Sequence, residues 1–407
     1  MDVIHQRCAG LDVHKDEVVA CARTMSGRKV VRTSARFATT TRGLLALSEW
    51  LSTHQCQTVA LEATGVYWKP VWHMLEGQFV LVLANPGHVR AIPGRKSDMN
   101  DAAWLADLVA HGLIRGSFVP PTAIQELRDL TRTRKQLGRQ IAQHSLRLQK
   151  TLEDANLKIA SFVSDLLGVS GRAILRGLIE GETDPGRLVA RTTGLLRADP
   201  DQLQAALEGQ VREHHRFLLR LHLTQIEAIE VGLRTVDARL ELLLTPLRAV
   251  VERLSTIPGV STLVAQTIIA EVGVDVGRFA TAGHLRSWVG LCPRLDESAG
   301  KRRSTRVRHG APWLKTVLVQ AAWAAIRRRD AYPYAQFQRL KAKRGPKKAI
   351  VAVAASLLTA VYFMLRDEVP YHDLGVHYFD RHDTARAAKR LTKRLEALGF
   401  KVALSAA

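Results

Sequence analysis

The chain has 407 residues, of which 46% are hydrophobic, and its 59 Lys and Arg residues against 38 Asp and Glu residues give it a formal net charge of +21. This length and hydrophobic content support two or three domains, each with its own core, and exclude a chain that is disordered throughout. The excess of positive charge favours a polyanionic partner, either nucleic acid or an anionic membrane surface.

The first 120 residues alternate β-rich runs with helical segments. Three strands joined by tight turns come first, followed by a helix and by two pairs of a strand and a helix. This order predicts an α/β domain over residues 1–121, with a mixed sheet, helices on its faces and an end at Pro120 and Pro121. The predicted strands are AGLDVHK, EVVACART, KVVRTSARF, TVALEA and FVLVLANP, and the predicted helices are RGLLALSEWLST, VYWKPVWHMLEG and SDMNDAAWLADLVAHG.

Acidic residues interrupt the apolar runs of this predicted domain. Asp12 lies in the first strand and Glu62 in a later one, while Asp98 and Asp101 are three residues apart at the start of a helix and share a face of it. Carboxylates from two strands and a helix can meet at a sheet edge, where Mg²⁺ or Mn²⁺ relieves their repulsion and stabilises the oxygens of a phosphoryl transfer. In the alternative interpretation these acids are surface residues and helix N-terminal residues. We expect Asp107 to point to the opposite side of its helix, into solvent.

Two long amphipathic helices are predicted in the middle of the chain, over residues 122–253. The first covers residues 124–159, and the second carries apolar residues at heptad spacing over residues 219–254. Such heptads need a partner helix, and the spacing leaves open whether the two helices fold back on each other or pair between chains. Pro246 is expected to kink or end the second helix. Residues 167–200, between the two, predict short helices and loops.

Residues 254–407 return to helical patterns and predict a mainly helical C-terminal domain. Between Lys301 and Lys348 the sequence has 15 Lys or Arg residues and a single acid, Asp330, so this stretch holds +14 of the net charge. It is therefore the expected surface for a polyanion. The predicted nucleic-acid contacts in it are Lys301, Arg302, Arg303, Arg306, Arg308, Arg327, Arg328, Arg329, Lys347 and Lys348.

Two short motifs of this domain indicate phosphate chemistry. IPGV, at residues 257–260, is typical of a helix-hairpin-helix turn whose backbone N–H groups near Gly259 hold a phosphate, although Pro-Gly is also an ordinary turn. Ser298 precedes a small-residue turn and a cluster of basic residues, which supply the exposed hydroxyl and the positive charge that attack on a phosphodiester requires. A basic loop that binds the DNA backbone without chemistry fits the spacing equally well, and Ser304 is a rival for the nucleophile.

Several other patterns bear on location. The uncharged residues 349–365 predict a buried core helix rather than a membrane span, because the segment is short and diluted by Ala, Ser and Thr. The histidines at 372, 377 and 382, with Asp380, have the spacing of a loop rather than of a metal site, and a basic tail helix follows. The four cysteines show no CxxC spacing, and the opening MDVIHQR lacks the apolar segment of a signal peptide. We therefore expect a cytoplasmic protein with no membrane partner.

A set of motifs spread over nearly the whole chain resembles the IS-one-ten family of bacterial insertion-sequence transposases. The motifs are GLDVHK, LEATGVYW, the KSDMNDA helix, IPGV followed by AEVG, GLCPRLDESAGK and VHYFDRHD. The resemblance implies an α/β plus α fold with an RNase H/RuvC-like N-terminal domain, a coiled coil that makes protein contacts, and a C-terminal transposase domain. It also implies that a metal-binding Asp, Glu, Asp, Asp quartet falls on Asp12, Glu62, Asp98 and Asp101, and that Ser298 is the nucleophile.

The same resemblance implies the partners. These are double-stranded DNA of the element and of its target, a structured noncoding bridge RNA that pairs with both, and further copies of the chain in a dimer that becomes a tetramer on DNA. We therefore predict an RNA-guided DNA transposase or recombinase, in the bacterial cytoplasm and associated with the nucleoid when active. One rival is a junction-resolving or RNase H-type nuclease, in which the carboxylates activate water. The other is a non-enzymatic nucleic-acid scaffold.

Overall fold

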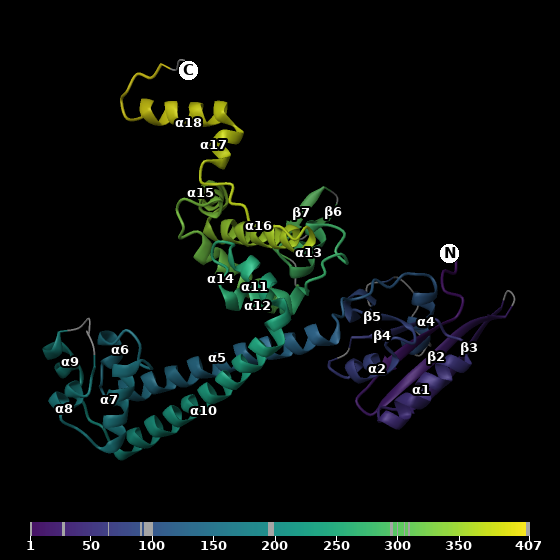
Figure 1. The fold of residues 1–407 in the computed structure, drawn as a ribbon, viewed down its shortest axis with the longest axis horizontal. Helices are drawn as coiled ribbons and strands as arrows, with labels where there is room; N and C mark the ends of the chain where they lie inside the picture. Colours follow the sequence, from purple (N-terminus) through teal and green to yellow (C-terminus); the bar gives the residue numbers. More distant parts are fainter. Residues whose placement is uncertain are drawn as a thin grey trace. The chain divides into compact units, whose positions relative to one another are not determined.

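The computed structural model describes residues 2–26, 29–63, 65–89, 92, 101–193, 199–293, 296–298, 300–304, 306–307 and 310–403. The chain divides into two compact units, which Figure 1 shows coloured along the sequence: unit 1 is Met1–Val119 and unit 2 is Pro120–Ala407. Each unit has its own elements and its own core.

Unit 1 is built on a five-stranded sheet in the order β3-β2-β1-β4-β5. Its strands are β1 (Cys8–Val13), β2 (Glu17–Ser26), β3 (Lys29–Ala38), β4 (Thr58–Glu62) and β5 (Val80–Ala84). The first three strands pair antiparallel, whereas β1, β4 and β5 run parallel to one another. The parallel pairs require helical crossovers, which α1 and α2 provide. The predicted mixed sheet of five strands is confirmed.

Helices cover both faces of this sheet. They are α1 (Thr41–Thr53), α2 (Trp68–Leu75), α3 (Pro86–Val89) and α4 (Asp101–Ala110). Alternate residues of β1 point to opposite faces. Leu11 packs in the core that α1 and α2 form with the sheet, whereas Cys8 packs with Val109 and Ala110 of α4. The face of β1 that carries Cys8 is therefore the face that α4 covers.

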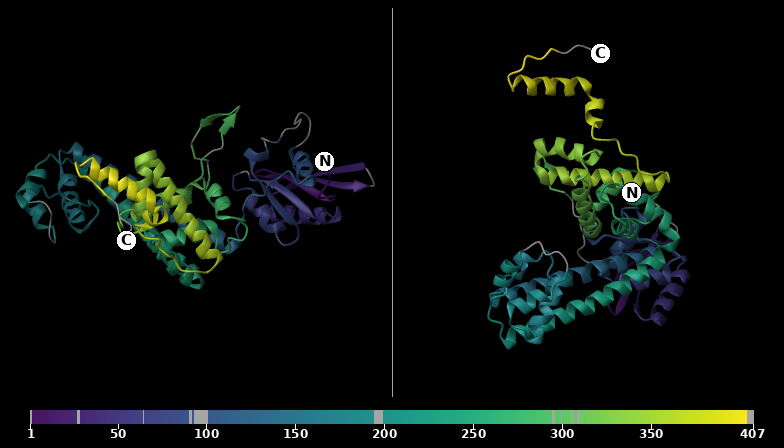
Figure 2. Two further views of the ribbon diagram at one scale, coloured as in Figure 1. Left: turned by 90° about the horizontal axis from the view of Figure 1, so that it is seen from above. Right: turned by 60° about the vertical axis from the view of Figure 1, so that its left-hand side comes forward.

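Two long helices organise unit 2, namely α5 (Thr122–Asp154) and α10 (Glu213–Leu244). They lie side by side in Figures 1 and 2. Arg134 of α5 binds Asp237 late in α10, whereas Asp154 at the end of α5 binds His215 near the start of α10, so the helices are antiparallel. The heptads therefore pair within one chain. As predicted for Pro246, α10 stops at its last leucine and a short 3-10 turn follows.

Four short helices pack at one end of this pair. They are α6 (Ile159–Phe162), α7 (Val169–Glu180), α8 (Pro185–Ala190) and α9 (Pro200–Ala206). Their leucines and isoleucines form a core with Leu148 and Leu152 of α5 and with Leu219 and Leu223 of α10. Short helices and loops were the expectation for this stretch, and the described part of it confirms them.

The rest of unit 2 is a cluster of helices around α16. The elements are α11 (Arg248–Ser255), α12 (Thr262–Val272), α13 (Ala282–Val289), α14 (Pro312–Ala325), α15 (Tyr332–Arg344) and α16 (Pro346–Arg366). Among the described residues, α16 is the one helix long and apolar enough to cross a membrane by length and composition. It packs against α11, α13, α14 and α15, and 56% of its most apolar window is buried inside the protein. The prediction of a core helix is confirmed.

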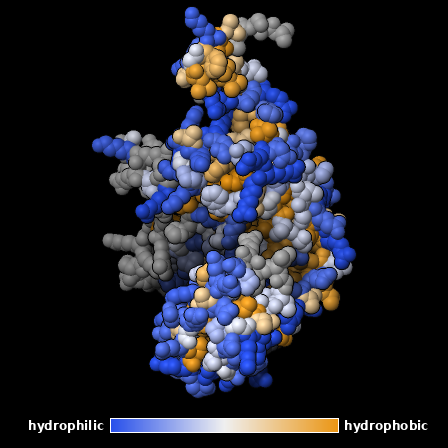
Figure 3. Space-filling model, turned by 90° about the vertical axis from the view of Figure 1, so that its left-hand side faces the viewer, coloured by the Kyte–Doolittle hydropathy of each residue, from blue (hydrophilic) through white to orange (hydrophobic). Residues whose placement is uncertain are grey.

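The chain then continues into α17 (Tyr378–His382) and α18 (Thr384–Glu396). The histidine stretch expected to be a loop is therefore partly helical, because α17 contains Asp380 and His382 and begins directly after His377. The predicted basic tail helix is α18. Its Leu391 and Leu395 are exposed, and apolar atoms of this tail are visible at the top of Figure 3.

Candidate functional site

Two of the predicted carboxylates lie next to one another in the sheet of unit 1, at the C-terminal ends of two parallel strands. β1 and β4 pair parallel with Leu11 opposite Leu61. The next residue of each strand is an acid, Asp12 on β1 and Glu62 on β4, so the register places the two on neighbouring strands, about 4.8 Å apart at the backbone. Both also lie on the same face of the sheet, because side chains alternate in step along paired strands.

The helix α4 lies directly on this face at Gly10. The thiol of Cys8 donates to the carbonyl of Ala106 at 3.4 Å, and a Cβ added at Gly10 would be 2.1 Å from the carbonyl oxygen of Ala102. The two strand residues from Cys8 to Gly10 advance about 6.7 Å, and the four helix residues from Ala106 back to Ala102 advance about 6 Å. Every second residue of β1 on this face therefore lies beside every fourth residue of α4. The next residue of β1 on this face, Asp12, therefore lies level with the N-terminal end of α4.

The first residue of α4 is Asp101, whose side chain is half-buried. The fourth predicted ligand, Asp98, lies outside the described residues. Within the described ranges, no group of three or more His, Cys, Asp and Glu side chains is arranged to hold a metal ion. One neighbour of the site was missed from the sequence: Nε2 of His14 lies 3.1 Å from Oδ2 of Asp12. Its position two residues beyond Asp12 was the available signal.

The prediction that Asp107 points into solvent is wrong. Its Oδ1 accepts a hydrogen bond from Nε of Arg23 at 2.9 Å, and Nη2 of Arg32 donates to both of its oxygens at 2.9 and 3.0 Å. The Arg23 residue is 3% exposed, so α4 buries this ion pair against β2. The prediction failed because α4 is buried on most of its circumference. A position nine residues after Asp98 therefore does not face solvent.

In unit 2, Ser298 ends the first strand of a β-hairpin. The strands are β6 (Asp296–Ser298) and β7 (Lys301–Ser304), with Ser298 opposite Lys301. Two residues join them, and the second, Gly300, has a φ of +73°, which glycine adopts without strain. Gly300 therefore has the left-handed backbone of a turn residue, while Ala299, the other residue of the predicted turn, lies outside the described residues. The side chains of Ser298, Arg302 and Arg303 lie outside what the structure describes, as does the whole of Arg308.

The remaining predicted nucleic-acid contacts lie on the surface. Those that the structure describes are exposed, namely Lys301, Arg306, Arg327, Arg328, Arg329, Lys347 and Lys348. Arg328 pairs at 3.4 Å with Asp330, the single acid of this stretch. The rival Ser304 is half-buried, and its Oγ accepts a hydrogen bond from the backbone N–H of Arg306 at 3.2 Å. That bond gives Ser304 a local role in the turn.

Gly259 has a packing role in the IPGV turn. Its φ is +80°, and an added Cβ would lie 2.2 Å from the carbonyl oxygen of Ala321 on α14. The following helix α12 is capped by Ser261, whose Oγ accepts from the N–H of Val264 at 3.4 Å. Close packing on α14 is sufficient to require a glycine here, and the phosphate contact of this turn stays a prediction.

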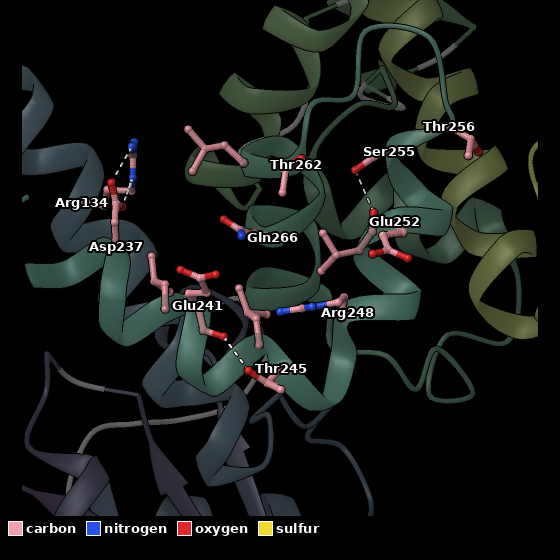
Figure 4. Close-up of a pocket in the computed structure, with 14 residues that line it drawn as sticks. Arg134, Asp237, Glu241, Thr245, Arg248, Glu252, Ser255, Thr256, Thr262 and Gln266 are labelled. Atoms are coloured by element: carbon pink, nitrogen blue, oxygen red, sulfur yellow. Dashed lines mark hydrogen bonds and ion pairs between the residues drawn. The ribbon is translucent and has the colours of Figure 1, made fainter. Parts of the chain in front are cut away.

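A cavity of about 860 Å³ lies at the bend between α10 and α11, and Figure 4 shows its lining residues. We call it the bend cavity. Arg134 and Asp237 pair on one side of it, while Glu241, Arg248 and Glu252 contribute further charges. Three carboxylates against two guanidinium groups make its wall slightly acidic, so this cavity is a poor place for a phosphate.

Comparison with known proteins assigns both units to one kind of enzyme. A family model described as Transposase, which represents the DEDD transposases of the IS110 type, matches residues 9–157. A second model, described as Transposase IS116/IS110/IS902 family, matches residues 251–338. The first match contains all four predicted carboxylates and the second contains Ser298, and together they span more than half of the chain. No curated protein matches the sequence. The chain belongs to the IS110 (IS-one-ten) family and is a transposase, an enzyme that acts on DNA.

Proposed function

We propose that this transposase cuts and rejoins DNA with the carboxylates of unit 1 as ligands of Mg²⁺ and with Ser298 as the nucleophile. The observation that carries the proposal is the register of β1 on β4, which sets Asp12 beside Glu62 on the face where α4 begins. Three antiparallel strands followed by two parallel ones support an RNase H/RuvC-like unit 1.

The donor set of unit 1 fits a hard divalent cation. Two carboxylates on adjacent strands repel each other unless a cation lies between them, and oxygen ligands suit Mg²⁺ or Mn²⁺. When bound, the cation polarises the scissile phosphate and stabilises the oxygens that gain charge. In the proposal Asp12 and Glu62 bind it from the strands and Asp98 and Asp101 from the start of the helix, while His14 holds the orientation of the Asp12 carboxylate.

Ser298 conserves the energy of the broken bond. Its Oγ attacks phosphorus and forms a serine–phosphate bond, the bond from phosphorus to one deoxyribose oxygen breaks, and the proton that the serine loses is balanced by one that the released sugar oxygen gains. A sugar hydroxyl of the other DNA end then attacks the phosphoserine and restores the diester. One P–O bond forms for each that breaks, so joining needs no external energy source. The basic residues of the hairpin favour the charge that develops on phosphorus.

The carboxylates are tested by conservative variants. Asp12→Asn and Asp101→Asn are expected to abolish Mg²⁺-dependent cleavage of element DNA while helix content and DNA binding persist. Asp16→Asn is the matched control, because it makes the same substitution at an exposed position four residues away. Full cleavage by both Asp12→Asn and Asp101→Asn would remove the metal-site assignment.

We extend the proposal to a structured guide RNA and to assembly as a dimer and then a tetramer on DNA. The exposed cations between Lys301 and Lys348 support a surface that binds a polyanion. Changing the pairing loops of the RNA is expected to move recombination to the DNA sites that match the new loops. Recombination at unchanged sites after ribonuclease treatment would contradict the role of the RNA.

A further inference from the structure

One of the tryptophans of unit 2, Trp313, lies beside three positively charged side chains. Trp313, the second residue of α14, is half-buried against α5. The charged groups of Arg132, Lys135 and Arg139 lie 5.6, 5.8 and 5.2 Å from the centroid of its ring. Their spacing of three and then four residues puts all three on one face of α5. Each is within the range of cation–π attraction, so the face of α5 and the indole form one cationic, aromatic wall.

The cluster has more positive charge than its carboxylate neutralises. Glu271 of α12 is 1% exposed, and Nε and Nη2 of Arg132 donate to its two oxygens at 2.8 Å each. Nζ of Lys135 is buried and has no hydrogen-bond partner among the described residues. Burial lowers the pKa of Lys135, and Arg139 lowers it further. A buried ammonium without an acceptor is unfavourable, and an anion bound beside it relieves that cost.

The charges line a cavity of about 370 Å³, which we call the Trp313 pocket. Besides Trp313, its apolar wall includes Leu263, Val264 and Val317, and Thr267 and Gln320 add a hydroxyl and an amide. A flat aromatic face, aliphatic walls and a few hydrogen-bonding groups suit a nucleobase, which stacks by its π-face and is held by its edge. The neighbouring bend cavity also touches Arg134 but has an excess of carboxylates, so an anion favours the Trp313 pocket.

Gly138 opens this pocket on the α5 side. It lies inside a helix of 33 residues, where glycine is the least favourable residue except proline. An added Cβ at this position would meet nothing within 4 Å, and the residue lines the pocket. A longer side chain at this position therefore has open space at the edge of the pocket.

We infer that the Trp313 pocket binds one unpaired nucleotide of a single-stranded nucleic acid, its phosphate at Lys135 and Arg139 and its base against the indole and the aliphatic wall. The inference rests on the proposed function, because strand exchange on DNA and a folded guide RNA both present unpaired bases. A base inside a duplex is covered on both faces by its neighbours and cannot enter a pocket of this size. An acidic peptide would use the cations but not the aromatic and aliphatic walls.

Filling the pocket tests the inference without removing a charge. Gly138→Met puts a long side chain at the opening, and Gly232→Met is the matched control, since an added Cβ at that α10 glycine also meets nothing within 4 Å and the residue does not line the pocket. The probes are oligothymidylate, oligouridylate, oligothymidylate with one abasic position, and a DNA duplex, with affinity measured by fluorescence anisotropy. Gly138→Met is expected to weaken binding of the single strands about tenfold, the size of one lost base stack, and to leave duplex binding unchanged.

Two further comparisons sharpen the result. Trp313→Ala is expected to act like Gly138→Met, and Trp313→Phe to restore most of the lost affinity, because the phenyl ring still stacks. The wild-type protein should bind the abasic probe more weakly than the intact strand. The Gly138→Met protein should bind the abasic probe and the intact strand with equal affinity. Tighter binding of oligouridylate assigns the pocket to RNA, and tighter binding of oligothymidylate assigns it to a displaced DNA strand.

The outcomes separate this inference from the proposed function. The inference would be overturned if Gly138→Met and Gly232→Met bound the single strands with equal affinity. It would also be overturned if Gly138→Met lost as much affinity for the duplex as for the single strands. Neither result would affect the proposed chemistry of Ser298. The inference would also be overturned if an oligoglutamate peptide displaced the single strands from the wild-type protein and failed to bind the Gly138→Met protein. That result would favour an acidic protein segment as the occupant. A loss of single-strand affinity in Gly138→Met supports the pocket even where Ser298 proves not to be the nucleophile, because binding is measured rather than strand transfer.

Discussion

Gly10→Ala tests whether the contact of α4 with β1 positions the carboxylates. The new Cβ would lie 2.1 Å from the carbonyl oxygen of Ala102 and 2.5 Å from the amide nitrogen of Ala106, whereas ordinary contacts begin at 3.4 Å. Both neighbours are backbone atoms of a buried helix and cannot rotate away, so α4 has to retreat by about 1 Å. Overpacking of this kind costs about 1–3 kcal/mol of the free energy of unfolding.

The same shift moves Asp101 relative to Asp12. A misplacement of about 1 Å at a reacting centre costs up to about 100-fold in rate, so cleavage should fall by more than the loss of stability explains. Stability is measured by urea unfolding followed by circular dichroism, and cleavage by single-turnover assays at saturating Mg²⁺ in the absence of urea. Gly116→Ala is the control, since its added Cβ would meet a side-chain carbon of Val82 at an ordinary 3.7 Å.

Two results would refute this reasoning. Wild-type stability of Gly10→Ala would mean that α4 does not press on β1 at this residue. A loss of stability with an unchanged cleavage rate would mean that α4 packs there but does not place a catalytic group.

Three further predictions concern unit 2. Glu271→Gln leaves Arg128 and Arg132 without their carboxylate and should cost about 3 kcal/mol in urea unfolding, the lower end for a broken buried pair because Arg132 is one-third exposed; an unchanged midpoint would contradict the buried pair. Burial, followed by His144, lowers the pKa of His222 from its ordinary value of 6.5, so the unfolded chain binds the proton more readily and stability should fall as the pH drops below about 6.5. His222→Gln should flatten that dependence in unfolding curves measured between pH 5 and pH 8, and an unaltered slope would argue against it. Lys347→Gln combined with Lys348→Gln should lower the slope of log affinity against log salt by up to about 1.8 for duplex DNA, and a flat salt dependence of the wild-type protein would contradict a phosphate-binding surface.

Local patterns predicted the elements of unit 1 because each strand and helix carries its own periodicity. Asp12 and Glu62 were found for a physical reason: an acid inside a buried run is costly and needs a purpose. Their adjacency could not be read from periodicity, since it depends on the register of β4 against β1. The environment of Asp107 was mispredicted because the side of α4 that faces the sheet is decided by the close contact at Gly10, which no helical spacing encodes.

Unit 2 shows the same limit at longer range. The heptads indicated a partner helix but not which one, and pairs such as Arg134 with Asp237, 103 residues apart, decide that it lies in the same chain. The cations at 132, 135 and 139 look in sequence like a solvated basic face. Only the fold brings Trp313 and Glu271 against them and turns that face into a pocket wall.

The most direct test of the account is to identify the atom that joins the protein to DNA. The transposase, with its RNA, is trapped on a nicked suicide DNA substrate in Mg²⁺, digested with protease and analysed by mass spectrometry. We predict a nucleotide on the peptide that contains Ser298, present in Ser304→Ala and absent in Ser298→Ala and in Asp12→Asn. Attachment to another residue, or clean hydrolysis with no adduct, would contradict the account and favour a metal-dependent nuclease.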